Sequence, residues 1–178
     1  MKKHLLLAST VIAGGVMGLT AAYAVTQGTE GPTSAGDFEV QLEIDNEVKI
    51  SNLADIDMGV YDGADLTAVQ DVCVYFNQDA PYSVVLDSND TPGTFELEIG
   101  GETIPYTVEY ADSDGTFEAV TAGTPLTGLN TATNTTDDDC VTNADNAQIQ
   151  VSALEADITG NPNGVYVETI DITVSPDI

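Results

Sequence analysis

Apolar and polar residues alternate with a period of two over most of the chain, as they do in strands that bury one face. The clearest stretch is residues 37–45, where Phe38, Val40, Leu42 and Ile44 lie on one face and acidic or amide side chains on the other. This pattern predicts a half-buried strand. Similar alternation or β-rich composition predicts further strands at residues 48–53, 56–61, 69–76, 82–86, 94–99, 104–110, 117–120, 147–154 and 165–174.

Turn residues separate these stretches at the spacing of an all-β domain. Gly100-Gly101 fits a two-residue hairpin turn, and Pro105 indicates an edge position or a bulge in the strand that follows. Residues 123–146 are polar and rich in Thr, Asn and Asp, which predicts a long surface loop. Residues 144–157 are the best helix candidate, but their β-branched alternation favours a strand. Many short strands at this spacing indicate an antiparallel β-sandwich.

The first 24 residues have a different character. Lys2, Lys3 and His4 precede an apolar run, and Ala22-Tyr23-Ala24 has the small-x-small pattern of a cleavage site. We therefore expect a secretory signal peptide over residues 1–24, with an apolar run too short to span a membrane. We expect the exported protein to have no membrane span.

The remaining chain falls into three expected parts. Residues 25–36 are rich in Gly and Thr and predict a flexible leader. Residues 37–46 contain the alternating stretch, and residues 47–178 contain the other predicted strands and form the expected β-sandwich domain.

Charge narrows the possible functions. The chain has 30 acidic and three basic residues and a formal net charge of −27. Beyond residue 24 the only cation is Lys49, and there is no histidine, arginine or tryptophan. This composition excludes Ser-His-Asp and Cys-His catalysis and arginine clamps on phosphate. Nucleic-acid binding is excluded as well, because neutralising phosphates requires Lys and Arg.

A pair of carboxylates is the remaining route to catalysis in so acidic a chain. A glycosidase places two carboxylates in a cleft, whereas nearly all acidic residues here lie on outward strand faces or in turns. We therefore expect no enzymatic activity and no catalytic residue.

Cys73 and Cys140 are the only cysteines. An even number of cysteines in an exported chain favours one disulfide over two free thiols. In the chain-entropy model, closing a loop of about 67 residues stabilises the fold by roughly 4 kcal/mol.

Calcium is the cofactor that so acidic a surface could bind. The candidate ligands are Asp112, Asp114, Asp137, Asp138 and Asp139. None of them lies in the D-x-[DN]-x-[DN]-G pattern of an EF-hand loop, so solvated turn carboxylates are the favoured explanation. We therefore expect no cofactor and keep calcium as the alternative.

The two ends of the chain carry a resemblance to known proteins. Residues 164–174 (GVYVETIDITV) follow the pattern G-x-Y-x-[DE]-T-[ILV]-x-[ILV]-x-V, and in mid-chain a C-V-x-x-N-like strand leads into residues 82–86 (YSVVL). This arrangement resembles the spore coat protein U and archaic chaperone–usher pilin families. Those families usually have a cysteine soon after the N-terminal alternating segment, and residues 44–53 contain none.

The resemblance implies an Ig-like, pilin-type antiparallel β-sandwich that lacks one strand, which the neighbouring subunit supplies. Phe38, Val40, Leu42 and Ile44 would be the donated side chains. A final strand with Tyr166, Ile170, Ile172 and Val174 would line the acceptor groove or meet a chaperone. The resemblance also implies a head-to-tail polymer of identical subunits, a periplasmic chaperone, an outer-membrane usher and a location on the bacterial cell surface.

The alternating segment has a second interpretation. Residues 37–45 can be the first strand of their own domain, which is the usual meaning of an alternating strand. In that case the protein is a self-contained secreted β-sandwich acting as a coat, matrix or binding module, with calcium as a possible stabiliser.

Overall fold

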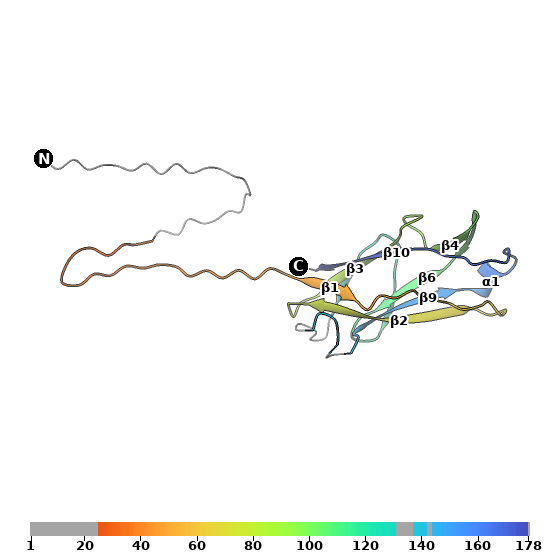
Figure 1. Ribbon diagram of the computed structural model, residues 1–178, viewed down its shortest axis with the longest axis horizontal. Coiled ribbons are helices and arrows are strands. Elements are labelled where there is room, and N and C mark those ends of the chain that lie inside the picture. The colour runs from red at the N-terminus through yellow and green to blue at the C-terminus, as the bar shows by residue number, and fades with distance from the viewer. Residues whose placement is uncertain (1–24, 131–136, 142–143, 178) are drawn as a thin grey trace. The chain divides into compact units, whose positions relative to one another are not determined.

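The computed structural model describes residues 25–130, 137–141 and 144–177 (Figure 1). The chain divides into two units, Met1–Ile44 and Asp45–Ile178. The signal peptide expected over residues 1–24 lies outside the described residues.

In the first unit, residues 25–44 contain one isolated antiparallel bridge, between Thr26 and Asp37. The Asp37 amide donates to the Thr26 carbonyl at 3.1 Å, and the Thr26 amide donates to Asp37 Oδ1 at 3.2 Å. The half-buried strand predicted over residues 37–45 is absent, because residues 38–44 belong to no strand. Their four apolar side chains are between 68% and 83% exposed. Alternation shows that a segment can pair as a strand, but a strand also needs a partner for its backbone groups.

The regular secondary structure of the second unit is almost entirely antiparallel strand. A five-stranded sheet has the order β1-β2-β9-β6-β7, a three-stranded sheet has the order β10-β3-β8, and β4 pairs with β5 in a hairpin. The strands are β1 Val48–Ser51, β2 Leu66–Phe76, β3 Tyr82–Ser88, β4 Glu96–Ile99, β5 Glu102–Pro105, β6 Thr107–Ala111, β7 Phe117–Ala119, β8 Leu126–Leu129, β9 Ala147–Ala153 and β10 Ile170–Pro176.

The core lies between the two sheets and follows from the alternation in the sequence. Strands β3 and β9 have every second side chain buried, and the buried rows face each other across the core. The fully or nearly buried apolar residues include Val72, Val74, Phe76, Val84 and Leu86. The fold is therefore the Ig-like antiparallel β-sandwich that the sequence predicted.

One local prediction is confirmed, and the strand predicted beside it is divided in two. Ile99 pairs with Glu102, so Gly100-Gly101 forms the two-residue hairpin turn, and both glycines have positive φ, at 59° and 96°. The long return strand predicted over residues 104–110 is interrupted directly after Pro105, where β5 ends and β6 begins. Proline has no amide proton for a sheet ladder, which explains the break.

The polar stretch predicted as one long loop contains a strand, β8. Leu126 pairs with Val84 and Leu129 pairs with Tyr82, so three steps along β8 match two along β3. Gly128, at φ 79°, provides the extra residue. This bulge breaks the period of two, and the sequence pattern therefore missed the strand.

Two other predicted strands differ from the structure. The last strand begins at Ile170 and not at Val165, and before it only Val167 forms a bridge, with Glu98. Residues 56–61 form no strand, although Ile56 and Met58 pack against the core.

A four-residue helix, α1 Glu155–Ile158, follows β9, so half of the helix candidate at residues 144–157 is the strand that its alternation favoured, and only its last three residues are helical. No helix among the described residues has the length and apolarity to cross a membrane.

Candidate functional site at two open strand edges

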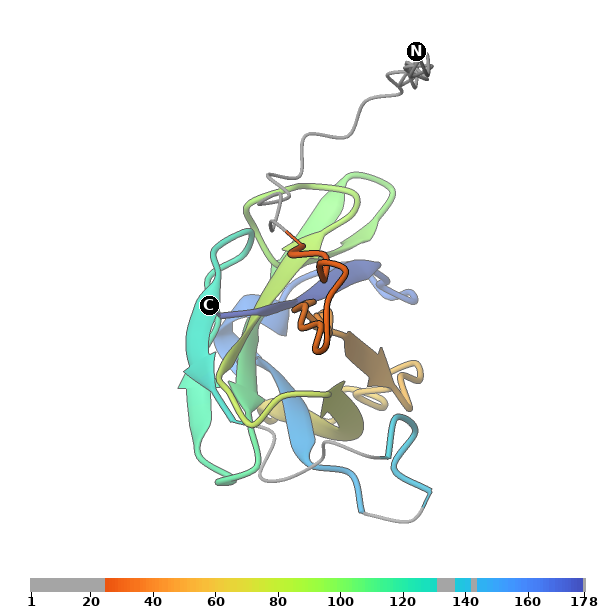
Figure 2. The same cartoon turned by 90° about the vertical axis from the view of Figure 1, so that its left-hand side faces the viewer.

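Two end strands, β1 of the five-stranded sheet and β10 of the three-stranded sheet, are not paired with each other. Within the described residues, β1 pairs only with β2, and β10 pairs only with β3. Cα atoms of β1 and β10 approach within 8 Å, yet the strands belong to different sheets (Figure 2). Each strand therefore has one free edge of backbone donors and acceptors, which is a template for a further strand.

The side chains along these two edges are apolar and incompletely covered. Val48 and Ile50 on β1, and Ile170, Ile172 and Val174 on β10, pack against the core but stay partly exposed. By contrast, the apolar side chains in the core-facing row of the neighbouring strand β3 are at most 1% exposed. We call the free edges of β1 and β10, together with these five side chains, the open side of the domain.

Three of the four C-terminal residues predicted to line a groove lie on the open side. Ile170, Ile172 and Val174 share one face of β10, whose exposure alternates strictly. Tyr166 lies before the strand, and its hydroxyl donates to the Pro162 carbonyl at 3.0 Å. The predicted donor side chains belong to the other unit of the chain.

The segment before β1 is held by a residue whose role the sequence analysis missed. Asn77 follows β2, and its Nδ2 donates to the Asp45 carbonyl at 2.8 Å. Its Oδ1 accepts a hydrogen bond from the Glu47 amide at 2.9 Å, and its own amide donates to the Glu47 carbonyl at 3.0 Å. We call these three bonds the Asn77 clamp. The only sequence signal for it was the asparagine of the C-V-x-x-N-like pattern.

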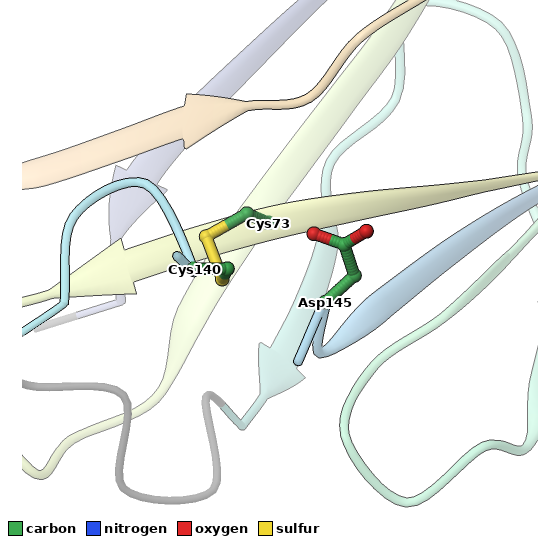
Figure 3. Close-up of side chains that lie close together, drawn as sticks. All are labelled: Cys73, Cys140 and Asp145. Carbon is green, nitrogen blue, oxygen red and sulfur yellow. A yellow bond between two sulfur atoms is a disulfide. The ribbon is translucent and has the colours of Figure 1, made fainter. Parts of the chain in front are cut away.

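The two cysteines form a disulfide that joins β2 to the segment 137–141 (Figure 3). Cys73 is fully buried, and the Cα atoms of Cys73 and Cys140 are 5.8 Å apart. Asp145 lies beside the bond, and its Oδ1 accepts a hydrogen bond from Asn52 Nδ2 at 2.6 Å. Among the described residues these three form the only group of potential metal ligands, and its sulfurs are already bonded to each other. The group therefore lacks the thiolates that bind metals.

The calcium candidates lie in two separate turns. In the first, Asp112 accepts hydrogen bonds from the Asp114 and Asn130 amides, and Asp114 accepts one from the Thr116 amide. That backbone bond from Thr116 lowers the pKa of Asp114 below its usual value. Such bonds stabilise the turn without a cation.

The second turn contains Asp137, Asp138 and Asp139. Asp138 Oδ2 forms an ion pair with Lys49 Nζ at 2.9 Å, and this hydrogen bond raises the pKa of Lys49. Asp139 accepts a hydrogen bond from the Val141 amide. No group of three acidic side chains close enough to share one ion occurs within residues 25–130, 137–141 and 144–177.

This chain is similar in fold to a solved structure. No protein-family model and no curated protein matches the chain. A solved chain from a chaperone–tip adhesin complex of CFA/I fimbriae is similar, with a TM-score of 0.53 and 18% sequence identity. The match covers 75% of this chain and 42% of that one. At this identity the likeness supports the β-sandwich fold alone.

Proposed function

We propose that this protein is a structural, non-enzymatic subunit of an extracellular pilus or surface filament, assembled by donor-strand complementation. The observation that carries the proposal is a complementary pair of features in one chain. The domain has an apolar open side flanked by two free strand edges, and residues 37–45 offer an unpaired strand sequence with four exposed apolar side chains.

The physical gain from combining the two features is large. Burying Phe38, Val40, Leu42 and Ile44 is worth roughly 6–12 kcal/mol in total, before the cost of ordering the segment. The added strand would also form backbone hydrogen bonds with the free edges, and its side-chain spacing would set the register. A contact between residues 37–45 of one subunit and the open side of the next uses two different surfaces. Such a head-to-tail contact does not close into a dimer, so its repetition produces a filament.

The partners follow from the same proposal. The main partner is another copy of this chain, and a periplasmic chaperone would cover the open side before assembly, with an outer-membrane usher as the assembly platform. The similar solved chain comes from a fimbrial chaperone–adhesin complex, which supports this assignment. The protein would leave the cell through the periplasm and reside in a filament on the bacterial surface.

Deleting the alternating segment tests this function. We compare the chain from Val25 with the chain from Asn46 on unheated SDS gels and by negative-stain microscopy. The longer chain should give heat-sensitive ladders and thin filaments, and the shorter chain should give neither, because it lacks the donated strand.

A matched pair of point variants separates side-chain docking from general effects of charge. Leu42→Asp places a carboxylate among the donated side chains and should abolish the ladders. Gln41→Asp adds the same charge to the opposite face and should leave them intact. A longer chain that stays monomeric, and that loses solubility when shortened, would overturn the filament and favour the self-contained sandwich.

A further inference from the structure

The connection between the donor segment and β1 is short enough for the segment to fold back onto its own domain. Only residues 45–47 separate Ile44, the last of the donated side chains in the donor segment 37–45, from β1, whose edge borders the open side. Hairpin loops of two to five residues are common. A donor that folds back on its own domain also benefits from a high effective concentration. Filling its own open side would therefore compete with filling that of a neighbour.

The Asn77 clamp acts on these three residues. In extended backbone the amide and carbonyl of one residue point to the same side as those of the residue two positions away. The clamp engages the Asp45 carbonyl and both backbone groups of Glu47, which are such a pair. The side-chain amide of Asn77 thus stands in for the peptide group of a partner strand and extends the β1–β2 ladder to Asp45.

The backbone angles agree with this extension. The favoured two-residue hairpin turns and the common three-residue loops contain at least one residue with positive φ. None of Asp45, Asn46 and Glu47 has positive φ, and no glycine occurs between Gly36 and Gly59. A reversal of the chain at residues 45–47 therefore has to break the bonds of Asn77 and move a non-glycine residue into the left-handed region.

We propose that Asn77 is a positioning residue that keeps the donor segment from filling its own domain and so directs it to a second copy of this chain. The inference rests on the proposed function and adds to it the reason why exchange between chains prevails over self-complementation. Asn77 binds neither the donated side chains nor the apolar row of β10 in this scheme; it acts only through Asp45 and Glu47.

A photo-crosslinking experiment on the chain from Val25 tests the proposal. A benzoyl-phenylalanine replaces Phe38, and irradiation records whether it crosslinks within its own chain or to a neighbour, at several protein concentrations. The variant Asn77→Ala should raise the ratio of intrachain to interchain product roughly tenfold, since two side-chain hydrogen bonds are lost. Polymer ladders should weaken in proportion.

Asn146→Ala is the matched control. The Asn146 side chain also binds one backbone donor and one acceptor, the amide and carbonyl of Val74, both at 2.8 Å. Its loss should lower stability without changing the crosslinking ratio. Asn77→Asp, which keeps the acceptor for Glu47 and loses the donor to Asp45, replaces Asn77→Ala if that variant does not fold.

The outcomes separate the clamp from the proposed function. An unchanged ratio in the Asn77 variant, or an equal change in both asparagine variants, overturns the clamp. If the unsubstituted chain gives no interchain product at any concentration, the filament proposal fails. The amount of intrachain product still tests the role of Asn77 in that case. It should rise in the Asn77 variant, and an unchanged amount would overturn the inference.

Discussion

At the scale of single residues, one polar contact joins the two sheets inside the apolar core. The hydroxyls of Tyr82 on β3 and Tyr110 on β6 lie 3.0 Å apart, and both side chains are fully buried. Each hydroxyl satisfies the other, so neither remains unpaired in an apolar interior. A third half-buried tyrosine, Tyr106, donates to Glu168 Oε2 and stacks on Phe95 with ring centroids 5.7 Å apart. Burial raises the pKa of all three tyrosines above the usual value.

These pKa shifts predict alkaline unfolding. The three tyrosines keep their protons in the folded state at a pH at which the unfolded chain releases them. Their contribution to stability is therefore fully present below pH of about 10 and is lost as the pH rises further. Each group should lower the free energy of unfolding by up to about 1.4 kcal/mol per pH unit in that range. Urea unfolding between pH 8 and 11, followed by tyrosinate absorbance, measures the slope.

A double variant, Tyr82→Phe with Tyr110→Phe, controls this prediction. It removes two of the three ionising groups, so its stability should fall less steeply with pH than that of the unsubstituted protein. Equal slopes would show that the two hydroxyls have no part in the alkaline transition.

At the scale of elements, the segment 137–141 is fastened to the five-stranded sheet although it contains no strand. The disulfide joins it to β2, and the Lys49–Asp138 ion pair and a 3.4 Å hydrogen bond from Ser51 to the Asp138 carbonyl join it to β1. Solvent screens exposed ion pairs, so the Lys49–Asp138 pair contributes little to stability. The disulfide should therefore account for most of the fastening.

Replacing both cysteines tests this ranking. Cys73→Ala with Cys140→Ala should lower the free energy of unfolding by about 4 kcal/mol, the chain-entropy value for a loop of this length. Chemical denaturation measures the loss. The reduced but unsubstituted protein keeps its sulfur atoms, so its loss separates the crosslink from the packing of Cys73. A loss below 1 kcal/mol in both proteins would contradict the assigned role.

The sequence pattern predicts elements well where the period of two is unbroken. It located β2, β3 and β9, because each of these strands has buried apolar residues at alternate positions, and it located β4 and the hairpin turn at Gly100-Gly101 from alternation and turn residues. It missed β8, whose row is shifted by the bulge at Gly128. It also placed the start of the last strand five residues early, because Val165 and Val167 continue the alternation but are 79% and 64% exposed.

The sequence predicted which apolar side chains of β10 belong to the candidate site, but it did not predict the free strand edges or the Asn77 clamp. Alternation identified the apolar face of β10 before the structure was known. The free edges depend on sheet order, which places β1 and β10 at the ends of two different sheets. The Asn77 clamp joins residues 32 apart in sequence through a side chain. A pattern of neighbouring residues contains neither kind of long-range information.

At the scale of the whole molecule, the charge lies outside a core that is almost purely apolar. Apart from Tyr82 and Tyr110 with their paired hydroxyls, Ser88 is the only buried polar residue among those described, and the acidic side chains of this part of the chain all reach the surface or lie partly exposed. With 30 acidic residues against three basic ones, the folded state concentrates negative charge that the unfolded chain would spread out. Dissolved salt should screen this repulsion.

We expect the melting temperature to rise by several degrees as NaCl increases from about 10 mM to about 1 M, because the Debye length falls from roughly 30 Å to 3 Å. Calcium and magnesium chloride at equal millimolar concentrations should act alike. The carboxylates of Asp112, Asp114 and Asp139 already accept backbone hydrogen bonds, and Asp138 binds Lys49. Differential scanning fluorimetry of the chain from Val25 measures each effect. A specific calcium site prefers the larger ion and its flexible coordination, so a markedly greater rise with calcium than with magnesium would contradict screening alone.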